Sequence, residues 1–287
     1  MRIPFSSSSP RLSLFTGILC ISIYPILIRI TPVSGVTAAF YRLSIASLLL
    51  WPYILGRKQW KRETLRFWKP LVGCGLLFAA DIASWNLSIQ YSSATQASLL
   101  TNLSPIWVGL TSFLFLPQKP SPFFWIGAVV ALTGLVLFMG LQLFTNLAFD
   151  RGFGLGLLSG ICYAAYLMLS KKVLQNVNLL NFMACMTTVG SVFLLCFCVL
   201  GKQELGGFST LVWESLLIQA LVCQLLGWFS VSYALTHIPA QQVSISLLSQ
   251  AVLTALLAWL LLGEQLSASM MLGGILLLTG IAITFRK

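Results

Sequence analysis

The residue best suited to chemistry in this sequence is a carboxylate inside an apolar run. Asp81 stands about ten residues into that run, and Trp85 follows four positions later. Residues at i and i+4 share one face of a helix, so the indole and the carboxylate are expected side by side. A carboxylate can bind a proton or a cationic group, and an aromatic ring can pack an apolar group or bind a cation.

Arg42 is the expected partner of Asp81. At about 1.5 Å per residue, Asp81 lies roughly 15 Å into its helix, and Arg42 enters about 10 Å from the opposite side. A charge at membrane depth costs about 2.5–3.5 kcal/mol on insertion scales, so it usually faces a cavity or a partner. Two interpretations follow: a coupling or binding pair, or an ion pair that only locks helices together. They are compatible, because a carboxyl group beside an arginine can still titrate.

Two polar stripes at helical spacing provide further candidates. One comprises Thr95, Ser98, Asn102 and Pro105, and the other Gln242, Ser246, Ser249 and Gln250. Such stripes either join helices, at about 0.6 kcal/mol per hydrogen bond, or line a water-filled path. The larger amides, Asn102 and Gln250, are the expected lining residues. Pro105 opens the backbone locally, whereas its counterpart Ala251 lacks that feature, which predicts that the two stripes differ.

Aromatic residues complete the candidate site. Gln224 and Trp228 repeat the i, i+4 arrangement later in the chain, and three tyrosines fall on early helices of the two halves: Tyr24, Tyr163 and Tyr166. Each of these rings either contacts a substrate or only packs between helices. We predict a substrate site made of Tyr24, Asp81, Trp85, Asn102, Tyr163, Tyr166, Gln224, Trp228 and Gln250, with Arg42 and Asp81 as the coupling or ion pair.

These residues belong to an internal duplication. An offset of 146 positions aligns Gln96 with Gln242 and Ser98 with Ser244, and it also aligns Leu132-Thr133-Gly134 with Leu278-Thr279-Gly280. Identities alone are weak evidence in a chain rich in Leu and Ala. The polar residues, the loop and the glycines nevertheless fall in one register, which indicates two repeats.

Composition identifies the elements as membrane helices. Hydrophobic residues make up 58% of the chain and charged residues 8%, and the mean hydropathy is +0.92. Apolar runs of about 18–23 residues match a hydrocarbon core of roughly 30 Å. We expect ten spans, the first a helix and not a cleaved signal peptide: 12–30, 36–55, 71–89, 94–116, 123–143, 153–170, 179–200, 211–235, 240–262 and 268–285.

The expected domains follow from these spans. Residues 1–11 form a disordered cytoplasmic tail, 12–143 the first five-helix repeat, 144–152 a connecting loop and 153–287 the second repeat. Thirteen of the 17 Lys and Arg residues fall on one side, three on the other, and Arg42 lies within a span. The positive-inside rule places both termini in the cytoplasm. The net charge of +11 therefore reflects orientation, and nucleic acid is not an expected partner.

An odd number of spans in each repeat makes the repeats run oppositely through the membrane. Inverted repeats are typical of secondary transporters, whose substrate sites lie near the midplane between the repeats. No metal motif, phosphate-binding glycine loop or nucleophile–base pair is present. We therefore expect no enzyme activity, no cofactor and no metal.

At these residues the chain resembles the EamA-type transporters of the drug/metabolite transporter superfamily. The similar segments are 91–100 with Ser104-Pro105, and 238–240 onward to Leu262-Gly263-Glu264-Gln265-Leu266-Ser267. The first repeat departs from the family's Leu-Gly-Glu ending, with Leu116-Pro117-Gln118. Arg42 and the Asp81…Trp85 pair also look like features of one bacterial branch.

The resemblance implies a ten-helix basket of two inverted five-helix repeats around a central cavity. The third, fourth, eighth and ninth helices would line it, with contributions from the first and sixth. Family members move amino acids, nucleotide sugars, sugar phosphates, S-adenosylmethionine or drugs, often outward.

The expected function is secondary-active transport of a small polar metabolite by alternating access, in a bacterial inner membrane. An amino acid or related amine, possibly exported, is the first candidate substrate, and S-adenosylmethionine or a nucleotide-like metabolite is the alternative. A non-transporting membrane scaffold or lipid-handling protein is the alternative from another class. The expected partners are the substrate, the lipid bilayer and protons as coupling ion, and a homodimer stays open.

Overall fold

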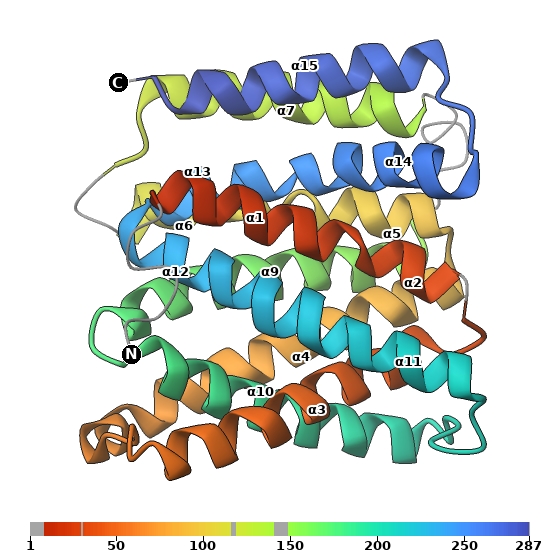
Figure 1. The fold of residues 1–287 in the computed structure, drawn as a ribbon. Helices are drawn as coiled ribbons and strands as arrows, with labels where there is room; N and C mark the ends of the chain where they lie inside the picture. Colours follow the sequence, from red (N-terminus) through yellow and green to blue (C-terminus); the bar gives the residue numbers. More distant parts are fainter. Residues whose placement is uncertain (1–8, 30, 116–118, 141–148, 287) are drawn as a thin grey trace. The chain divides into compact units, whose positions relative to one another are not determined.

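The computed structural model describes residues 9–29, 31–115, 119–140 and 149–286, and every regular element in these ranges is a helix (Figure 1). Within them, nine helical segments are long and apolar enough to cross a membrane, and a shorter apolar helix follows at Ala268–Thr284. Each of these ten segments overlaps one of the ten predicted spans. The predicted tail falls mostly, and the loop at 144–152 partly, outside the described residues, and the repeat boundaries stay predictions.

The helices are α1 (Pro10–Ser22), α2 (Tyr24–Arg29), α3 (Gly35–Gly56), η1 (Arg62–Phe67), α4 (Trp68–Tyr91), α5 (Ala94–Thr101), α6 (Ser104–Phe115), α7 (Pro122–Met139), α9 (Arg151–Leu174), α10 (Leu179–Leu200), α11 (Thr210–Ile218), η2 (Gln219–Trp228), α12 (Phe229–His237), α13 (Ala240–Leu247), α14 (Ser249–Leu262) and α15 (Ala268–Thr284).

The chain forms two compact units, and each takes helices from both halves of the sequence. The first unit comprises Met1–Ala79 and Leu169–Ile238, and the second comprises Ala80–Met168 and Pro239–Lys287. Helices α4 and α9 contribute one end to each unit. Many large apolar side chains face outward, among them Leu48, Leu200 and Leu272, which are 71%, 84% and 66% exposed. Such surfaces suit a lipid environment and would be costly in water.

In the first unit, α3 packs along α10, and α1 packs on η2 and α12. The hydroxyl groups of Ser47 and Thr188 lie 2.7 Å apart, and Gly190 lies against Leu43. Positions thus rise along α3 as they fall along α10, so the two helices are antiparallel. The segment η2, in the middle of the eighth span, is a π-helix. Pi-helical turns are rare and often lie at functional sites, and the sequence pattern did not predict this one.

In the second unit, the tightest contact joins α7 and α15. A Cβ atom added at Gly134 would lie 2.3 Å from the backbone nitrogen of Leu277, and one at Gly280 would lie 2.3 Å from that of Ala131. Gly127 faces Gly280, and Gly134 faces Gly273. The offset of 146 relates Gly127 to Gly273 and Gly134 to Gly280. The Gly127–Gly280 contact and the Gly134–Gly273 contact are therefore equivalent. The pair is therefore symmetric and antiparallel, as two inverted repeats require.

Candidate functional site

Asp81 is buried in the second unit, where helix α9 supplies its hydrogen bond. The side chain of Asp81 is 8% exposed, and the hydroxyl of Ser159 donates to its Oδ1 at 2.5 Å. Ser159 Oγ also lies 2.8 Å from Thr101 Oγ1 at the end of α5. Because the hydroxyl hydrogen of Ser159 is used in the bond to Asp81, the hydroxyl of Thr101 must be the donor to Ser159. A three-residue chain, which we call the carboxylate relay, thus joins α4, α5 and α9.

Glycines in α9 allow the close approach that this relay needs. A Cβ atom added at Gly160 would lie 2.7 Å from the backbone oxygen of Leu100, and one at Gly156 would lie 3.0 Å from Ser88 Oγ. Ser88 in turn donates to the backbone oxygen of Gly152 at 2.7 Å. Small residues of this kind let helix backbones approach closely inside membranes. The glycines therefore bring Ser159 to the carboxylate.

The relay gives Asp81 a defined chemistry. A buried carboxylate that accepts a charge-assisted hydrogen bond is held in one orientation. A carboxyl group of this kind can in principle bind a proton or a cation. Both options suit a membrane-embedded binding site.

Five other predicted residues belong to the second unit. Tyr163 and Tyr166, on α9, have ring centroids 6.5 Å apart and an interplanar angle of 14°. Trp85 is half-buried in α4, one turn beyond Asp81, and Asn102 is half-buried directly after Thr101. Gln250 is half-buried in the first turn of α14. That these residues contact one substrate stays a prediction.

Four of the predicted residues belong to the first unit: Tyr24, Arg42, Gln224 and Trp228. Arg42 and Gln224 are buried polar residues, and Tyr24 contacts Arg42. The guanidinium carbon of Arg42 lies 4.4 Å from the ring centroid of Tyr24. Arg42 is 4% exposed, and Gln224 in the π-helix is fully buried. Trp228 packs edge-on against Phe78 at 4.9 Å.

Three polar atoms of Arg42 and Gln224 lack hydrogen bonds inside the described part of the chain. Arg42 Nε and both amide atoms of Gln224 have no hydrogen-bond partner there. Buried polar side chains nearly always find a partner, in the protein or in bound water, so these atoms need an explanation. Water or a polar ligand is the explanation that suits a binding site.

The predicted Arg42–Asp81 pair stays a prediction, because the two residues belong to different units. What the structure adds within the second unit are Ser159 and Thr101, which the sequence reasoning missed. Their hydroxyls stand among many serines and threonines in apolar runs, so they carry little signal individually. The combination of Gly156, Ser159 and Gly160 on one stretch of α9 was the available indication.

Comparisons with known proteins agree with the duplication. The model of the EamA-like transporter family matches residues 10–140 and again 150–286. A protein of Archaeoglobus fulgidus named an uncharacterized transporter is 25% identical over 257 residues, which is 87% of each chain. The uncharacterized transporter YdfC of Bacillus subtilis is 24% identical over 203 residues, 70% of this chain and 66% of that protein. A crystal structure matches with a TM-score of 0.83 over 98% of both chains at 16% identity, which shows the fold alone.

Proposed function

The chain belongs to the EamA-like transporter family of the drug/metabolite transporter superfamily, and on that premise we propose that it is a secondary-active transporter of a small polar metabolite. The substrate that the site suits best is an amino acid or a related amine. It is a multi-pass membrane protein, and we place it in a bacterial inner membrane with both termini in the cytoplasm.

The carboxylate relay carries the proposal about substrate class. Asp81 is the one acidic residue deep within a predicted span, and Ser159 fixes one of its oxygens at 2.5 Å. An ammonium group would form a charge-assisted pair with this carboxylate, which would replace the hydration that the ammonium group loses. In the unloaded protein, a proton on the same carboxyl group would remove the cost of a buried charge. Asp81 thus serves either the substrate's cationic group or the coupling proton.

Aromatic and amide side chains would recognise the rest of the substrate. Tyr163 and Tyr166 lie one and two turns beyond Ser159 on α9, and their rings would pack an apolar side chain or bind a cation. In the first unit, the unpaired amide of Gln224 would offer a polar group a donor and an acceptor. The family resemblance supports the two tyrosines, because it implies a contribution from the sixth helix, which carries them.

Alternating access needs helices that can change locally. Two spans of the second unit are interrupted, between α5 and α6 and between α13 and α14, and a π-helix interrupts the eighth span of the first unit. Broken helices are typical of secondary transporters, where they expose backbone groups at the site. We infer that these interruptions are where the transporter adjusts as it binds and releases its substrate.

Counterflow in proteoliposomes tests the proposal. Vesicles with the purified protein would be loaded with one unlabelled compound and given the labelled compound outside. The compounds are amino acids, di- and polyamines, S-adenosylmethionine, nucleotide sugars and sugar phosphates. We expect accumulation of amine-bearing compounds, at least tenfold lower in Asp81→Asn and unchanged in Asp150→Asn. Asp150 is the matched control because it only caps α9, by accepting a hydrogen bond from the backbone nitrogen of Phe153 at 2.9 Å.

Other outcomes separate the alternatives. Accumulation of S-adenosylmethionine alone would favour the nucleotide-like class. Normal counterflow by Asp81→Asn at every pH would contradict the assigned role of this carboxylate. Absence of counterflow for every compound, with folded protein in the vesicles, would contradict the proposed substrate classes and favour a scaffold.

A further inference from the structure

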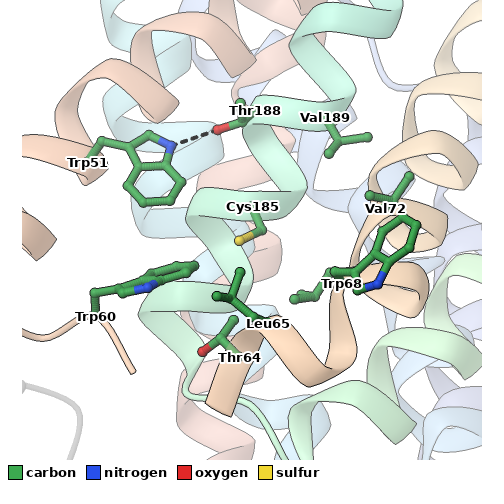
Figure 2. A pocket seen from close by; sticks show the side chains of 10 residues that line it. Trp51, Trp60, Thr64, Leu65, Trp68, Val72, Cys185, Thr188 and Val189 are labelled. Atoms are coloured by element: carbon green, nitrogen blue, oxygen red, sulfur yellow. Dashed lines mark hydrogen bonds between the residues drawn. The ribbon is translucent and has the colours of Figure 1, made fainter. Parts of the chain in front are cut away.

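The first unit contains a cavity that the proposed transport function does not use. It lies where the end of α3 meets η1, the start of α4 and the middle of α10 (Figure 2). Its volume is about 210 Å³. Trp51 and Trp60 stand on one side in Figure 2 and Trp68 and Val72 on the other, with Leu65 and Cys185 between them. The surface that these side chains present to the cavity is apolar.

Hydrogen bonds and ring contacts hold the walls of this cavity in place. The indole nitrogen of Trp51 donates to Thr188 Oγ1 at 2.8 Å, and the rings of Trp51 and Trp60 are 5.2 Å apart. Thr64 also lines the cavity, and Asn181 Nδ2 donates to its Oγ1 at 3.1 Å. Thr64 is 3% exposed. The segment between α3 and α4 is therefore fixed onto α10, and the cavity does not depend on a ligand for its shape.

The mouth of the cavity combines exposed apolar side chains with a tryptophan. Leu65 and Trp68 are 57% and 56% exposed. They stand three residues apart, so in the tight 3₁₀ turn of η1 and the start of α4 they share one face. Tryptophan is enriched at membrane–water interfaces, where its ring sits at the level of the lipid headgroups. The opening is thus expected at the boundary of the bilayer.

The segment that contains Leu65 and Trp68 is strongly basic. Residues 57–69 contain six basic residues and one acidic residue, Glu63. All six basic side chains are exposed: Arg57, Lys58, Lys61, Arg62, Arg66 and Lys69. Lys69 Nζ lies 5.7 Å from the ring centroid of Trp68, which places a cation directly beside the apolar opening. The positive-inside rule puts this segment on the cytoplasmic side.

We propose that this cavity binds one molecule of an anionic phospholipid from the cytoplasmic leaflet. Part of one acyl chain fills the space between the tryptophans, and the basic residues of 57–69 hold the phosphate-bearing headgroup. Two independent features favour this occupant. The apolar walls offer nothing to a water-soluble anion, and a cluster of four to eight basic residues next to a membrane helix is the pattern that binds anionic lipid.

Thermal unfolding of the full-length protein in a non-ionic detergent tests this site. The probes are phosphatidylglycerol and phosphatidylcholine with the same acyl chains, and inorganic phosphate. We expect phosphatidylglycerol to raise the unfolding temperature by several degrees more than phosphatidylcholine does. Inorganic phosphate should have no such effect.

Two triple variants separate the local charge from the total charge. The first, Arg62→Gln with Arg66→Gln and Lys69→Gln, should lose the preference for phosphatidylglycerol. The control, Lys119→Gln with Lys172→Gln and Arg286→Gln, removes equal charge from the same predicted side and should keep it. Equal stabilisation by phosphatidylcholine or by phosphate, or a preference that survives the first triple change, would overturn the proposal.

A second measurement uses the unaltered protein and so does not depend on the folding of variants. Cys185 lines the cavity, whereas Cys196 on the same helix is exposed. In nanodiscs, peptide mass spectrometry would follow the reaction of each thiol with N-ethylmaleimide. Phosphatidylglycerol should slow labelling of Cys185 several-fold relative to Cys196, compared with phosphatidylcholine. An unchanged ratio of the two rates would show that no anionic lipid occupies the cavity.

Discussion

The fourth and ninth spans are equivalent in the two repeats, and both are interrupted, yet different residues interrupt them. In the fourth span α5 ends at Thr101 and α6 begins at Ser104. In the ninth, α13 ends at Leu247 and α14 begins at Ser249. Asn102 and Leu248, the first residues after α5 and α13, are 146 positions apart. The interruption therefore occupies the same place in both repeats.

Proline accounts for the interruption of the fourth span. Pro105 has no N–H to give the backbone oxygen of Thr101, and its ring crowds that oxygen. The backbone nitrogen of Leu103 instead donates to Leu100 at 3.2 Å, and that of Ile106 donates to Leu103 at 2.9 Å. These shorter-range bonds satisfy the backbone where the regular helix cannot continue.

Serine hydroxyls accompany the interruption of the ninth span. The hydroxyl of Ser249 donates to the backbone oxygen of Ser246 at 2.7 Å, and that of Ser246 donates to Gln242 at 2.7 Å. Hydroxyls that bond to helix carbonyls compete with the regular pattern and bend helices. The sequence predicted a difference between the repeats because Ala251 stands where the first repeat has a proline. The ninth span is nevertheless interrupted, without a proline. The two repeats share the position of the interruption and differ in the residues that make it.

The largest effect expected from testing this comparison comes from moving a proline along α14. Ala251 is in the first turn, where Ala251→Pro should cost about 1 kcal/mol, the value of one hydrogen bond. Ala258 lies in the helix interior, where Ala258→Pro should cost about 3 kcal/mol or more. Equilibrium unfolding by SDS in mixed micelles would measure both. Equal losses would mean that the helix is not interrupted at Leu248.

The next effect concerns α7 and α15, one helix from each repeat, which meet in a symmetric contact. Gly134→Ala and Gly280→Ala should each lower the free energy of unfolding by about 1–3 kcal/mol, because each new Cβ meets backbone. The two losses should be similar, since the two glycines are equivalent. Gly154→Ala is the control, because nothing lies within 4 Å of its added Cβ. Strongly unequal losses would contradict the symmetric contact.

The smallest effect concerns the serines of the ninth span. Replacing Ser246 and Ser249 together by alanine should change the free energy of unfolding by only a few tenths of a kcal/mol, since alanine favours helix. It should, however, slow amide hydrogen exchange around Leu248 by allowing the helix to continue. Ser244→Ala, which removes a similar hydroxyl bond nearer the start of α13, should leave that exchange unchanged. If the wild type, the double variant and Ser244→Ala all showed the same amide exchange around Leu248, the serines would not be the cause of the interruption.

The fold followed from the sequence because its signals are long and redundant. Each apolar run identifies a span independently of its neighbours, and the repeated Leu-Thr-Gly segments fall on α7 and α15, where their glycines meet. The interruption at Pro105 could be expected because one residue type causes it. The interruption at Leu248 and the π-helix at 219–228 could not, because they depend on which of several possible hydrogen-bond partners each backbone group takes.

The candidate site was predictable only in part. Asp81 stood out because a carboxylate at membrane depth is costly and rare. Its partners Ser159 and Thr101 did not, because hydroxyls are common in spans and their role depends on how closely α9 approaches α5. That approach is set by glycines, whose effect appears only when the helices are packed.

Ligand-dependent thermal unfolding would show most directly whether Asp81 is part of the binding site. Thermal unfolding of the purified protein would be followed with amino acids and amines, and with nucleotide sugars and sugar phosphates as contrasts. A ligand at 100 times its dissociation constant adds about 2.7 kcal/mol to the folded state. We predict a raised unfolding temperature with an amine-bearing compound, lost in Asp81→Asn and kept in Asp150→Asn. An equal rise of the unfolding temperature in the wild type and in Asp81→Asn would contradict the placement of Asp81 in the binding site.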